Sequence, residues 1–346
     1  MHITIRAFLG GLAVALLTPC TPAGAAVYRT CDGDKVTWES SWVEYRVSNI
    51  SFPPRSAANT ALKRAWTGWN SYSPGSVFHF VFRSVGDTSW SSGDGRNSIA
   101  FTSDYGWGSG TLAVTMLRFD PCWWFDDGSI IETDVMFNPG RTWNFASYPA
   151  PDVRANSLAL VAAHELGHAL GLLHEDTRMA TMNSFYPDSG VLGNNNDPDP
   201  HADDVAGSRF LYGASSSTSR DLAMSVFKRT GAGTSALISA PTTARKGSIR
   251  TLSFTFSNRG TIRENSVVRV YASSDRRITT SDRFLGEMAL WADPGFEGTF
   301  TVTLPIPTTL VTGYYYLGFV ADPGSTIPET DEDNNGVGYT TRTYIY

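Results

Sequence analysis

The stretch HELGHALGLLH, residues 164–174, places three of the six histidines of the chain close to a glutamate. Its pattern is H-E-x-x-H-x-x-G-x-x-H. An α-helix turns by about 100° per residue, so His164 and His168 lie about 40° apart and can direct their rings at one metal ion. His174 would lie about 240° around from His168 if the helix continued.

Gly171 removes this obstacle, because glycine tolerates the left-handed conformation that ends a helix and turns the chain. His174 can then return as a third ligand. Three protein ligands leave one zinc position open for water, which is typical of a catalytic site. Glu165 is the expected general base. An amphipathic core helix would explain neither Gly171 nor Glu165, whereas a zinc-binding protein without turnover stays an alternative.

A methionine follows the third histidine at a short distance. Met182 lies in the segment ATMNSFYP, residues 180–187. The signature and this methionine together resemble the metzincins, in which a methionine turn lies beneath the zinc; Met179 is the second candidate for that position. Over residues 36–213 the chain resembles the matrixin-like metzincins most, with a first strand in residues 37–47, a first helix in 60–69 and a closing helix in 202–213.

The resemblance implies a zinc endopeptidase with an α+β fold, in which a twisted, mostly parallel sheet is combined with three helices. It implies one catalytic zinc ion bound by His164, His168 and His174, with Glu165 as the catalytic residue. It also implies that one strand forms the rim of the cleft and pairs with the extended substrate backbone. The residues expected in that strand are Gly110, Thr111, Leu112 and Ala113.

Some positions depart from the matrixin pattern. Glu175 follows the third histidine where matrixins usually have a small residue, and this resembles the astacins. Ser184 stands where astacins carry a tyrosine that approaches the zinc, and Tyr186 lies further on. Residues 110–115 contain no histidine, so we do not expect a second, structural zinc ion.

The N-terminus resembles a secretory signal. Arg6 precedes an apolar run, residues 7–17, that is too short to span a bilayer. Ala23-Gly24-Ala25 is a small-x-small cleavage site, so the mature, secreted chain is expected to begin near Ala26. A lipoprotein site at Cys20 is the alternative, and Pro19 argues against it.

Removal of this signal leaves two cysteines, Cys31 and Cys122. In an oxidising compartment two cysteines favour one disulfide. The alternative is an inhibitory thiolate from Cys31 on the zinc, as in matrixin propeptides, but the context RTCDG of residues 29–33 does not match theirs. The neighbouring residues 122–125, CWWF, are expected to pack around the disulfide or contact substrate.

The remaining pattern of residues 26–213 predicts a helix over 57–72, strands over 77–82 and 130–137, and the active-site helix over 157–171. His79 alternates with aromatic residues and is expected to be an ordinary strand residue. The acidic segment 188–200 is expected to be a solvated loop, and His201 a surface residue. Calcium binding by this loop, by Asp94 or by Asp104 is possible on composition but has no supporting spacing.

Residues 214–220 are rich in serine and are expected to form a flexible linker. From residue 221 to 346 short period-two strands predict an immunoglobulin-like β-sandwich. This region resembles the bacterial CARDB, or cell-adhesion-related, domains in residues 258–260, 283–286, 313–316 and 329–335. The resemblance implies a surface or matrix ligand, or a spacer. The acidic run around Asp331 is expected to be a solvated turn.

Composition narrows the classes of function. The formal charge is −6, and no basic cluster indicates nucleic-acid binding. The 41% hydrophobic content and ten tryptophans favour well-packed domains, and no segment is long enough to cross a membrane. We therefore expect a secreted zinc metalloendopeptidase acting on proteins or peptides. The alternative is a non-catalytic zinc-containing protein that binds surfaces.

Overall fold

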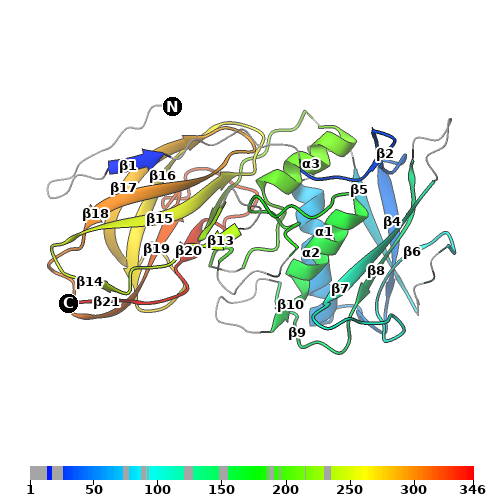
Figure 1. The fold of residues 1–346 in the computed structure, drawn as a ribbon, viewed down its shortest axis with the longest axis horizontal. Helices are drawn as coiled ribbons and strands as arrows, with labels where there is room; N and C mark the ends of the chain where they lie inside the picture. The colour runs from blue at the N-terminus through cyan, green and yellow to red at the C-terminus, as the bar shows by residue number, and fades with distance from the viewer. Residues whose placement is uncertain are drawn as a thin grey trace.

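The computed structural model describes residues 14–17, 26–72, 78–86, 91, 93–120, 128–147, 155–184, 186, 191–194, 196–214, 216–229 and 235–346. Figure 1 shows an α+β unit beside an all-β unit, with the helices between the α+β sheet and the all-β unit. The chain therefore forms two structural units of different fold class, as the sequence predicts.

The sheet of the N-terminal unit has five strands in the order β5-β4-β6-β8-β7. Three strand pairs are parallel, and β7 alone runs antiparallel, against β8. This confirms the prediction of a mostly parallel sheet. The strands are β4 (Trp42–Ser48), β5 (His79–Val85), β6 (Asn97–Phe101), β7 (Ala113–Phe119) and β8 (Ile130–Phe137); β2 (Thr30–Cys31), β3 (Asp34–Lys35), β9 (Trp143–Asn144) and β10 (Asn156–Ser157) are short.

The described residues of this unit form three helices, α1 (Ala57–Tyr72), α2 (Leu158–Ala169) and α3 (Ala202–Tyr212), and α1 and α2 pack on the sheet. The first helix packs against α2, where Trp69 is 1% exposed and donates to Ala163 O at 2.8 Å. Ser157 caps the N-terminus of α2, and its hydroxyl accepts from the amide of Leu160. The range expected for α1 is confirmed, and that for α2 extends too far at both ends by a residue or two.

The strand expected over residues 110–115 begins only at Ala113. Gly110 has φ +94°, a left-handed conformation, and Thr111 donates its amide to Gly108 O in a turn. The prediction of a strand is therefore wrong for Gly110, Thr111 and Leu112, because the chain forms a turn at Gly110 and enters the strand only at Ala113.

The chain reverses direction after α2 at Gly171, which has φ +91°. A Cβ at this position would lie 2.7 Å from Val36 O. The carbonyls at the helix end are capped by distant side chains: the Trp38 indole donates to Ala169 O at 2.9 Å, and the Tyr212 hydroxyl to Leu170 O at 2.7 Å. The predicted role of Gly171 in ending the helix is confirmed.

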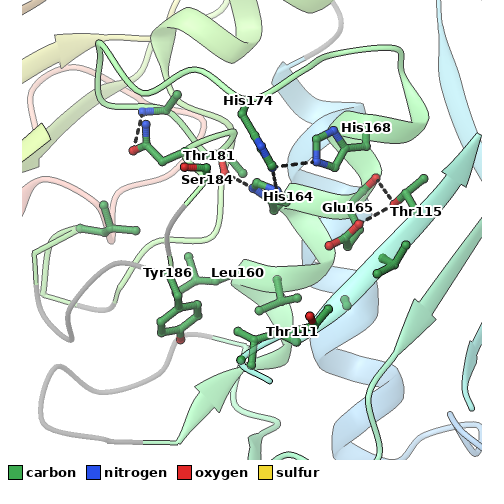
Figure 2. A pocket seen from close by; sticks show the side chains of 18 of the residues that line it. Thr111, Thr115, Leu160, His164, Glu165, His168, His174, Thr181, Ser184 and Tyr186 are labelled. Atoms are coloured by element: carbon green, nitrogen blue, oxygen red, sulfur yellow. Dashed lines mark hydrogen bonds between the residues drawn. The ribbon is translucent and has the colours of Figure 1, made fainter. Parts of the chain in front are cut away.

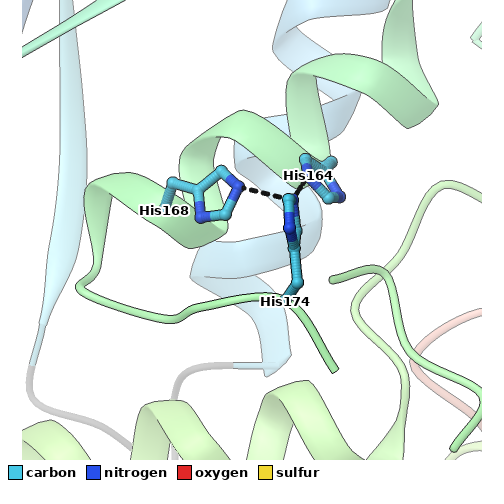
Figure 3. A group of neighbouring side chains, drawn as sticks. All are labelled: His164, His168 and His174. Atoms are coloured by element: carbon cyan, nitrogen blue, oxygen red, sulfur yellow. Dashed lines mark hydrogen bonds between the residues drawn. The ribbon is translucent and has the colours of Figure 1, made fainter. Parts of the chain in front are cut away.

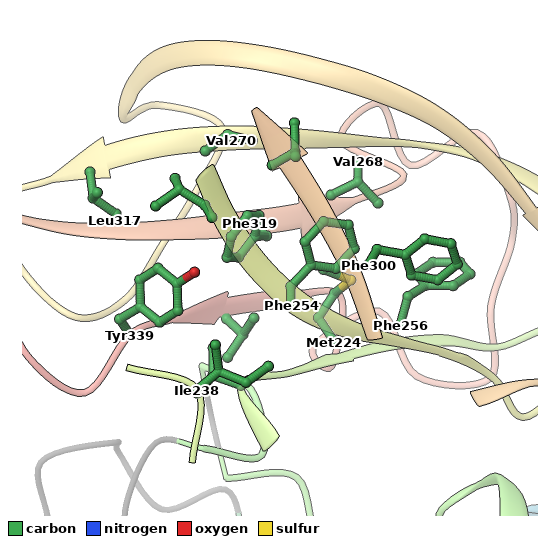
Figure 4. Close-up of a cluster of buried hydrophobic side chains, with 14 of the residues drawn as sticks. Met224, Ile238, Phe254, Phe256, Val268, Val270, Phe300, Leu317, Phe319 and Tyr339 are labelled. Atoms are coloured by element: carbon green, nitrogen blue, oxygen red, sulfur yellow. The ribbon is translucent and has the colours of Figure 1, made fainter. Parts of the chain in front are cut away.

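The C-terminal unit is a sandwich of two sheets, β1-β18-β15-β11 and β14-β21-β19-β16-β17, with β20 on β19. Its core contains Phe254, Phe300 and Phe319 (Figure 4). The strands are β11 (Leu222–Ser225), β14 (Thr243–Ala244), β15 (Ile249–Asn258), β16 (Glu264–Ser273), β17 (Arg283–Ala292), β18 (Glu297–Pro305), β19 (Gly313–Ala321), β20 (Gly336–Gly338) and β21 (Thr343–Ile345), with a separate pair β12 (Phe227–Arg229) and β13 (Ser235–Leu237). Strand β1 (Val14–Leu17) adds to β18 at the sheet edge.

The apolar core of the C-terminal unit extends across the boundary into the N-terminal unit. Leu160, Met179 and Leu192 of the N-terminal unit belong to the same buried cluster as Met224 and Phe227 of the C-terminal unit. The serine-rich connection is also held at its end, since Ser219 N donates to Thr261 Oγ1 at 2.7 Å and Ser219 O accepts from Thr261 N at 2.9 Å. The prediction of a flexible linker is therefore wrong for this end of residues 214–220.

Buried charges reinforce the contact between the units. Arg64 of α1 binds Asp199 through two hydrogen bonds and donates to Asp331 Oδ2 at 2.8 Å. Asp199 is 2% exposed and Asp331 9%, so both were wrongly expected to be solvated. Burial is possible because each carboxylate has an arginine partner.

A second buried arginine binds the same acidic segment. Arg259 of the C-terminal unit is 2% exposed, and it donates to Asp197 and contacts His201 Nδ1 at 3.2 Å. His201 is 3% exposed. The prediction of a surface histidine is wrong, because the second unit covers it.

The left-handed conformation of Gly171 leads to a stability prediction. The variant Gly171→Ala is expected to lower the free energy of unfolding by about 3 kcal/mol, from backbone strain and from overlap with Val36 O. The matched control is Gly213→Ala, at φ +85° with no atom within 4 Å of the added Cβ, where only the backbone strain of about 1 kcal/mol applies. Urea unfolding measures both; equal losses would contradict the role of the close approach.

The buried charges lead to a second prediction. The variant Arg259→Ala leaves Asp197 buried without its closest cation, so the free energy of unfolding is expected to fall by about 3 kcal/mol. The control is Arg263→Ala in the same unit, because the side chain of Arg263 is 57% exposed and its pair with Asp293 is solvated. That loss is expected to be about 1 kcal/mol or less. Similar thermal stability of the two variants would contradict this account.

Candidate metal centre

The three histidines of the signature meet at one point. His164 and His168 project from α2, and His174 approaches them after the chain reversal (Figure 3). Nε2 of His174 lies 3.2 Å from Nε2 of His164 and 3.2 Å from Nε2 of His168. Nitrogen ligands at 2.0–2.1 Å from a tetrahedral zinc ion lie about 3.3 Å apart, so this arrangement fits zinc.

Backbone carbonyls orient two of the rings. Nδ1 of His164 lies 2.8 Å from Thr181 O, and Nδ1 of His168 lies 2.8 Å from Leu172 O. Since a carbonyl only accepts, the proton belongs on Nδ1, and each Nε2 presents a lone pair. Burial lowers the pKa of His164 to about 3 and that of His168 to about 4, so both rings are neutral, as metal ligands must be.

Glu165 lies beside the three histidines between α2 and β7 and is 5% exposed. Figure 2 shows it facing Thr115, whose hydroxyl oxygen lies 2.6 Å from Glu165 Oε2. Burial raises the pKa of Glu165 to about 7, and the hydrogen bond from Thr115 opposes this rise. A carboxyl group with such a pKa can both accept and release a proton near neutral pH.

Met182 packs under the metal-binding turn of α2. It is 1% exposed, and a Cβ at Gly167 would collide with its sulfur. Gly167 lies between His164 and His168 in the sequence, so Met182 supports the turn that carries them. Met179 instead lines the neighbouring cavity. The contact with Gly167 favours Met182 over Met179 as the methionine beneath the histidines.

The turn that carries Met182 is fixed by a residue that we did not single out from the sequence. Asp204 of α3 is 1% exposed and accepts from the amides of Thr181 at 2.6 Å and Met182 at 3.2 Å. Thr181 is the residue whose carbonyl orients His164. An acidic side chain in the first turn of a helix was the only sequence signal, and its partners lie some twenty residues earlier in the chain.

A cavity of about 520 Å³ opens beside the histidines. It lies between the segment leading into β7 and helix α2 (Figure 2). The residues that line it are Gly110, Thr111, Leu112, Ala113, Val114, Thr115, Leu160, Val161, His164, Glu165, His168, His174, Met179, Ala180, Thr181, Asn183, Ser184, Tyr186, Leu192 and Phe227. The four residues expected at the cleft rim therefore line the cavity although three of them precede the strand.

Two further candidates have structural partners. The Tyr186 hydroxyl accepts from Ser157 N at 2.7 Å. Glu175 is 6% exposed and accepts from Thr177 N at 2.6 Å. His79, as expected, is an exposed strand residue.

A second group of described residues has ligand atoms within 4.8 Å of one another: Asp197, Asp199 and Asp331. Arg64 and Arg259 donate hydrogen bonds to these three carboxylates. The guanidinium groups supply the positive charge that a cation would otherwise bring. The donor set therefore favours zinc at the histidines and ion pairing at this acidic group.

Cys31 is 4% exposed and disulfide-bonded. Cys122, together with the aromatic residues 123–125, lies outside the described residues, so the pairing of Cys31 with Cys122 stays a prediction. The signal segment also lies outside them, except for the backbone of Val14–Leu17. No helix in the described ranges is long and apolar enough to span a bilayer.

Two family models match the chain. The matrixin model, Peptidase_M10, matches residues 37–213, and the CARDB model matches residues 234–338. A solved CARDB domain from a Pyrococcus furiosus protein, described as a complex with di-metal ions, is 17% identical. It covers 38% of this chain and 97% of that domain, with a TM-score of 0.27.

Curated relatives match about half of this chain. "Matrix metalloproteinase-18" of Xenopus laevis is 30% identical over 52% of this chain and 34% of that protein. "Neutrophil collagenase" of Homo sapiens is 33% identical over 52% of this chain and 34% of that protein, and "Interstitial collagenase" of Equus caballus is 31% identical over 51% and 33%. The chain thus spans about a third of the length of these relatives. With the matrixin model matched over half of its residues, the chain belongs to the matrixin family of metallopeptidases, and a CARDB domain follows its peptidase domain.

Proposed function

We propose that the protein is a secreted zinc metalloendopeptidase that hydrolyses internal peptide bonds of proteins. The observation that carries the proposal is the convergence of three Nε2 atoms, with that of His174 3.2 Å from each of the other two, beside the buried carboxylate of Glu165. Zinc bound there would supply a Lewis acid that polarises a carbonyl group and makes water a nucleophile near neutral pH.

The side chains of the chain then divide the work. His164, His168 and His174, which line the cavity, would hold the metal. Glu165 accepts the proton of the attacking water and donates it to the leaving amine nitrogen. Thr115 holds the Glu165 carboxyl through its hydroxyl, so the group that moves the proton has a fixed position.

Substrate backbone would bind along β7. This strand is the last in the sheet order, and among the described strands only β8 pairs with it. An extended peptide can therefore add to its other edge through main-chain hydrogen bonds, next to the cavity lined by Ala113, Val114 and Thr115. Main-chain hydrogen bonds would give affinity for peptides of many sequences, and the side-chain pockets would give specificity.

Secretion and a disulfide between Cys31 and Cys122 are part of this proposal. They rest on the signal-like sequence before Ala26 and on the oxidising compartment that secretion implies. The alternative is a non-catalytic zinc protein that binds surfaces. The buried Glu165 and the open cavity favour the enzyme, because a protein that only binds zinc has no need of either.

The test is cleavage of casein by the zinc-loaded chain, with and without a chelator, beside the variant Glu165→Ala. We expect chelator-sensitive cleavage, and a loss of about a thousandfold or more in Glu165→Ala from the removal of proton transfer. Zinc content by atomic absorption should be unchanged in this variant, since Glu165 is not a ligand. Residual activity close to wild type would exclude Glu165 as the base, and an inactive wild type with zinc bound would favour the binding protein.

A further inference from the structure

The wall of the cavity does not belong to the peptidase domain alone. Leu160 and Val161 of α2 line it, and so do Leu192 and Phe227. Phe227 is the first residue of β12, beyond the peptidase domain, and is 6% exposed. An aromatic side chain from the second domain thus lies in the wall of the cavity that contains the histidines.

We propose that the second, all-β unit completes the substrate pocket, with Phe227 limiting the length of the apolar side chain that the peptidase accepts. This inference rests on the proposed function, since it assigns a subsite to the same cavity. It makes the second domain part of substrate selection, whereas a docking module or a spacer would leave the peptidase domain self-sufficient.

The chemistry of the wall specifies the substrate side chain. Leu160, Val161, Leu192 and Phe227 are apolar, and in the described part of the wall Glu165 is the one acidic or basic side chain besides the histidines. A charged substrate side chain would lose its hydration there without gaining a partner. The pocket therefore fits aliphatic or aromatic side chains, and its depth depends on the ring of Phe227.

The second domain also holds the loop that carries Leu192. Val226 N donates to Val191 O at 3.0 Å, and Asn194 N donates to Gly336 O at 2.7 Å. The side chain of Asn194 makes two more hydrogen bonds to the backbone of Ile278. Its Nδ2 donates to Ile278 O at 2.6 Å, and its Oδ1 accepts from Ile278 N at 2.9 Å. Residues 191–194 are thus fixed on both sides of Leu192 by the all-β unit.

The position of Phe227 relative to the histidines is fixed by the same interface. The Thr255 hydroxyl donates to Phe227 O within the sandwich. Glu297 of β18 accepts from Met179 N at 3.1 Å, three residues before Met182. Together with the buried pairs of Arg64 and Arg259, these contacts hold the sandwich against the peptidase domain and keep Phe227 at a constant distance from the metal centre.

The experiment uses the full zinc-loaded chain and two series of fluorescent peptides. One series varies the residue before the scissile bond and the other the residue after it, each through alanine, leucine, phenylalanine and biphenylalanine. The variants are Phe227→Ala and the milder Phe227→Leu. The matched control is Phe256→Leu, because Phe256 is 0% exposed in the same core cluster but does not line the cavity.

In one series the wild type is expected to cleave the leucine peptide at least about tenfold faster, in kcat/KM, than the biphenylalanine peptide. Phe227→Ala should reduce that ratio by about tenfold or reverse it, Phe227→Leu should do so less, and Phe256→Leu should keep the wild-type ratio. Ratios in Phe227→Ala that match those of wild type and Phe256→Leu within about twofold would overturn the inference.

Binding separates this inference from the proposed activity. The same peptides are titrated by fluorescence anisotropy into Glu165→Gln, alone and combined with each variant. The ratio of Kd values should shift in the same way even if no peptide is cleaved, in which case the proposed function fails and the pocket assignment stands. Unchanged Kd ratios in the Phe227→Ala combination, or no binding by any peptide, would overturn the assignment.

Discussion

The reversal of the chain at Gly171 is the constraint on which the metal centre depends. Its φ of +91° and the approach of Val36 O leave no room for a side chain, so α2 ends within one turn of His168. His174 is then returned to the two helical histidines, and the following chain passes beneath them as the turn of Met182. Asp204 of α3 holds that turn through hydrogen bonds from the amides of Thr181 and Met182. One backbone conformation thus sets the relative positions of ligands, supporting methionine and closing helix.

The second constraint is the interface between the domains. Asp197 and Asp199 of the peptidase domain are buried at this interface. Arg64 of the same domain binds Asp199, and Arg259 of the all-β unit binds Asp197. Removing such charges from water is costly unless each has a partner, so the pairs specify one relative position of the domains. The apolar cluster that contains Leu160 of the peptidase domain and Met224 of the all-β unit crosses the same interface. The cavity beside the histidines is bounded by residues of both domains as a result.

The elements that depend on short stretches of sequence could be predicted from the sequence. The helices α1 and α2 follow from apolar periodicity, and the meeting of the three histidines follows from helix geometry and one glycine. The strand start at Ala113 was missed because the turn at Gly110 depends on a positive φ that the sequence does not specify. Burial of Asp331 was missed because its partner Arg64 is 267 residues away, and burial of His201 because Arg259 belongs to the other domain. Contacts of that kind carry no local signal.

The central claim is that the three histidines together hold one zinc ion with an open position. X-ray absorption spectroscopy on the full chain, loaded with one equivalent of zinc, tests this most directly. The account predicts three imidazole nitrogens and one oxygen at about 2.0–2.1 Å. A shell of oxygen ligands alone would place the zinc at the acidic group of Asp197, Asp199 and Asp331 and would contradict the account.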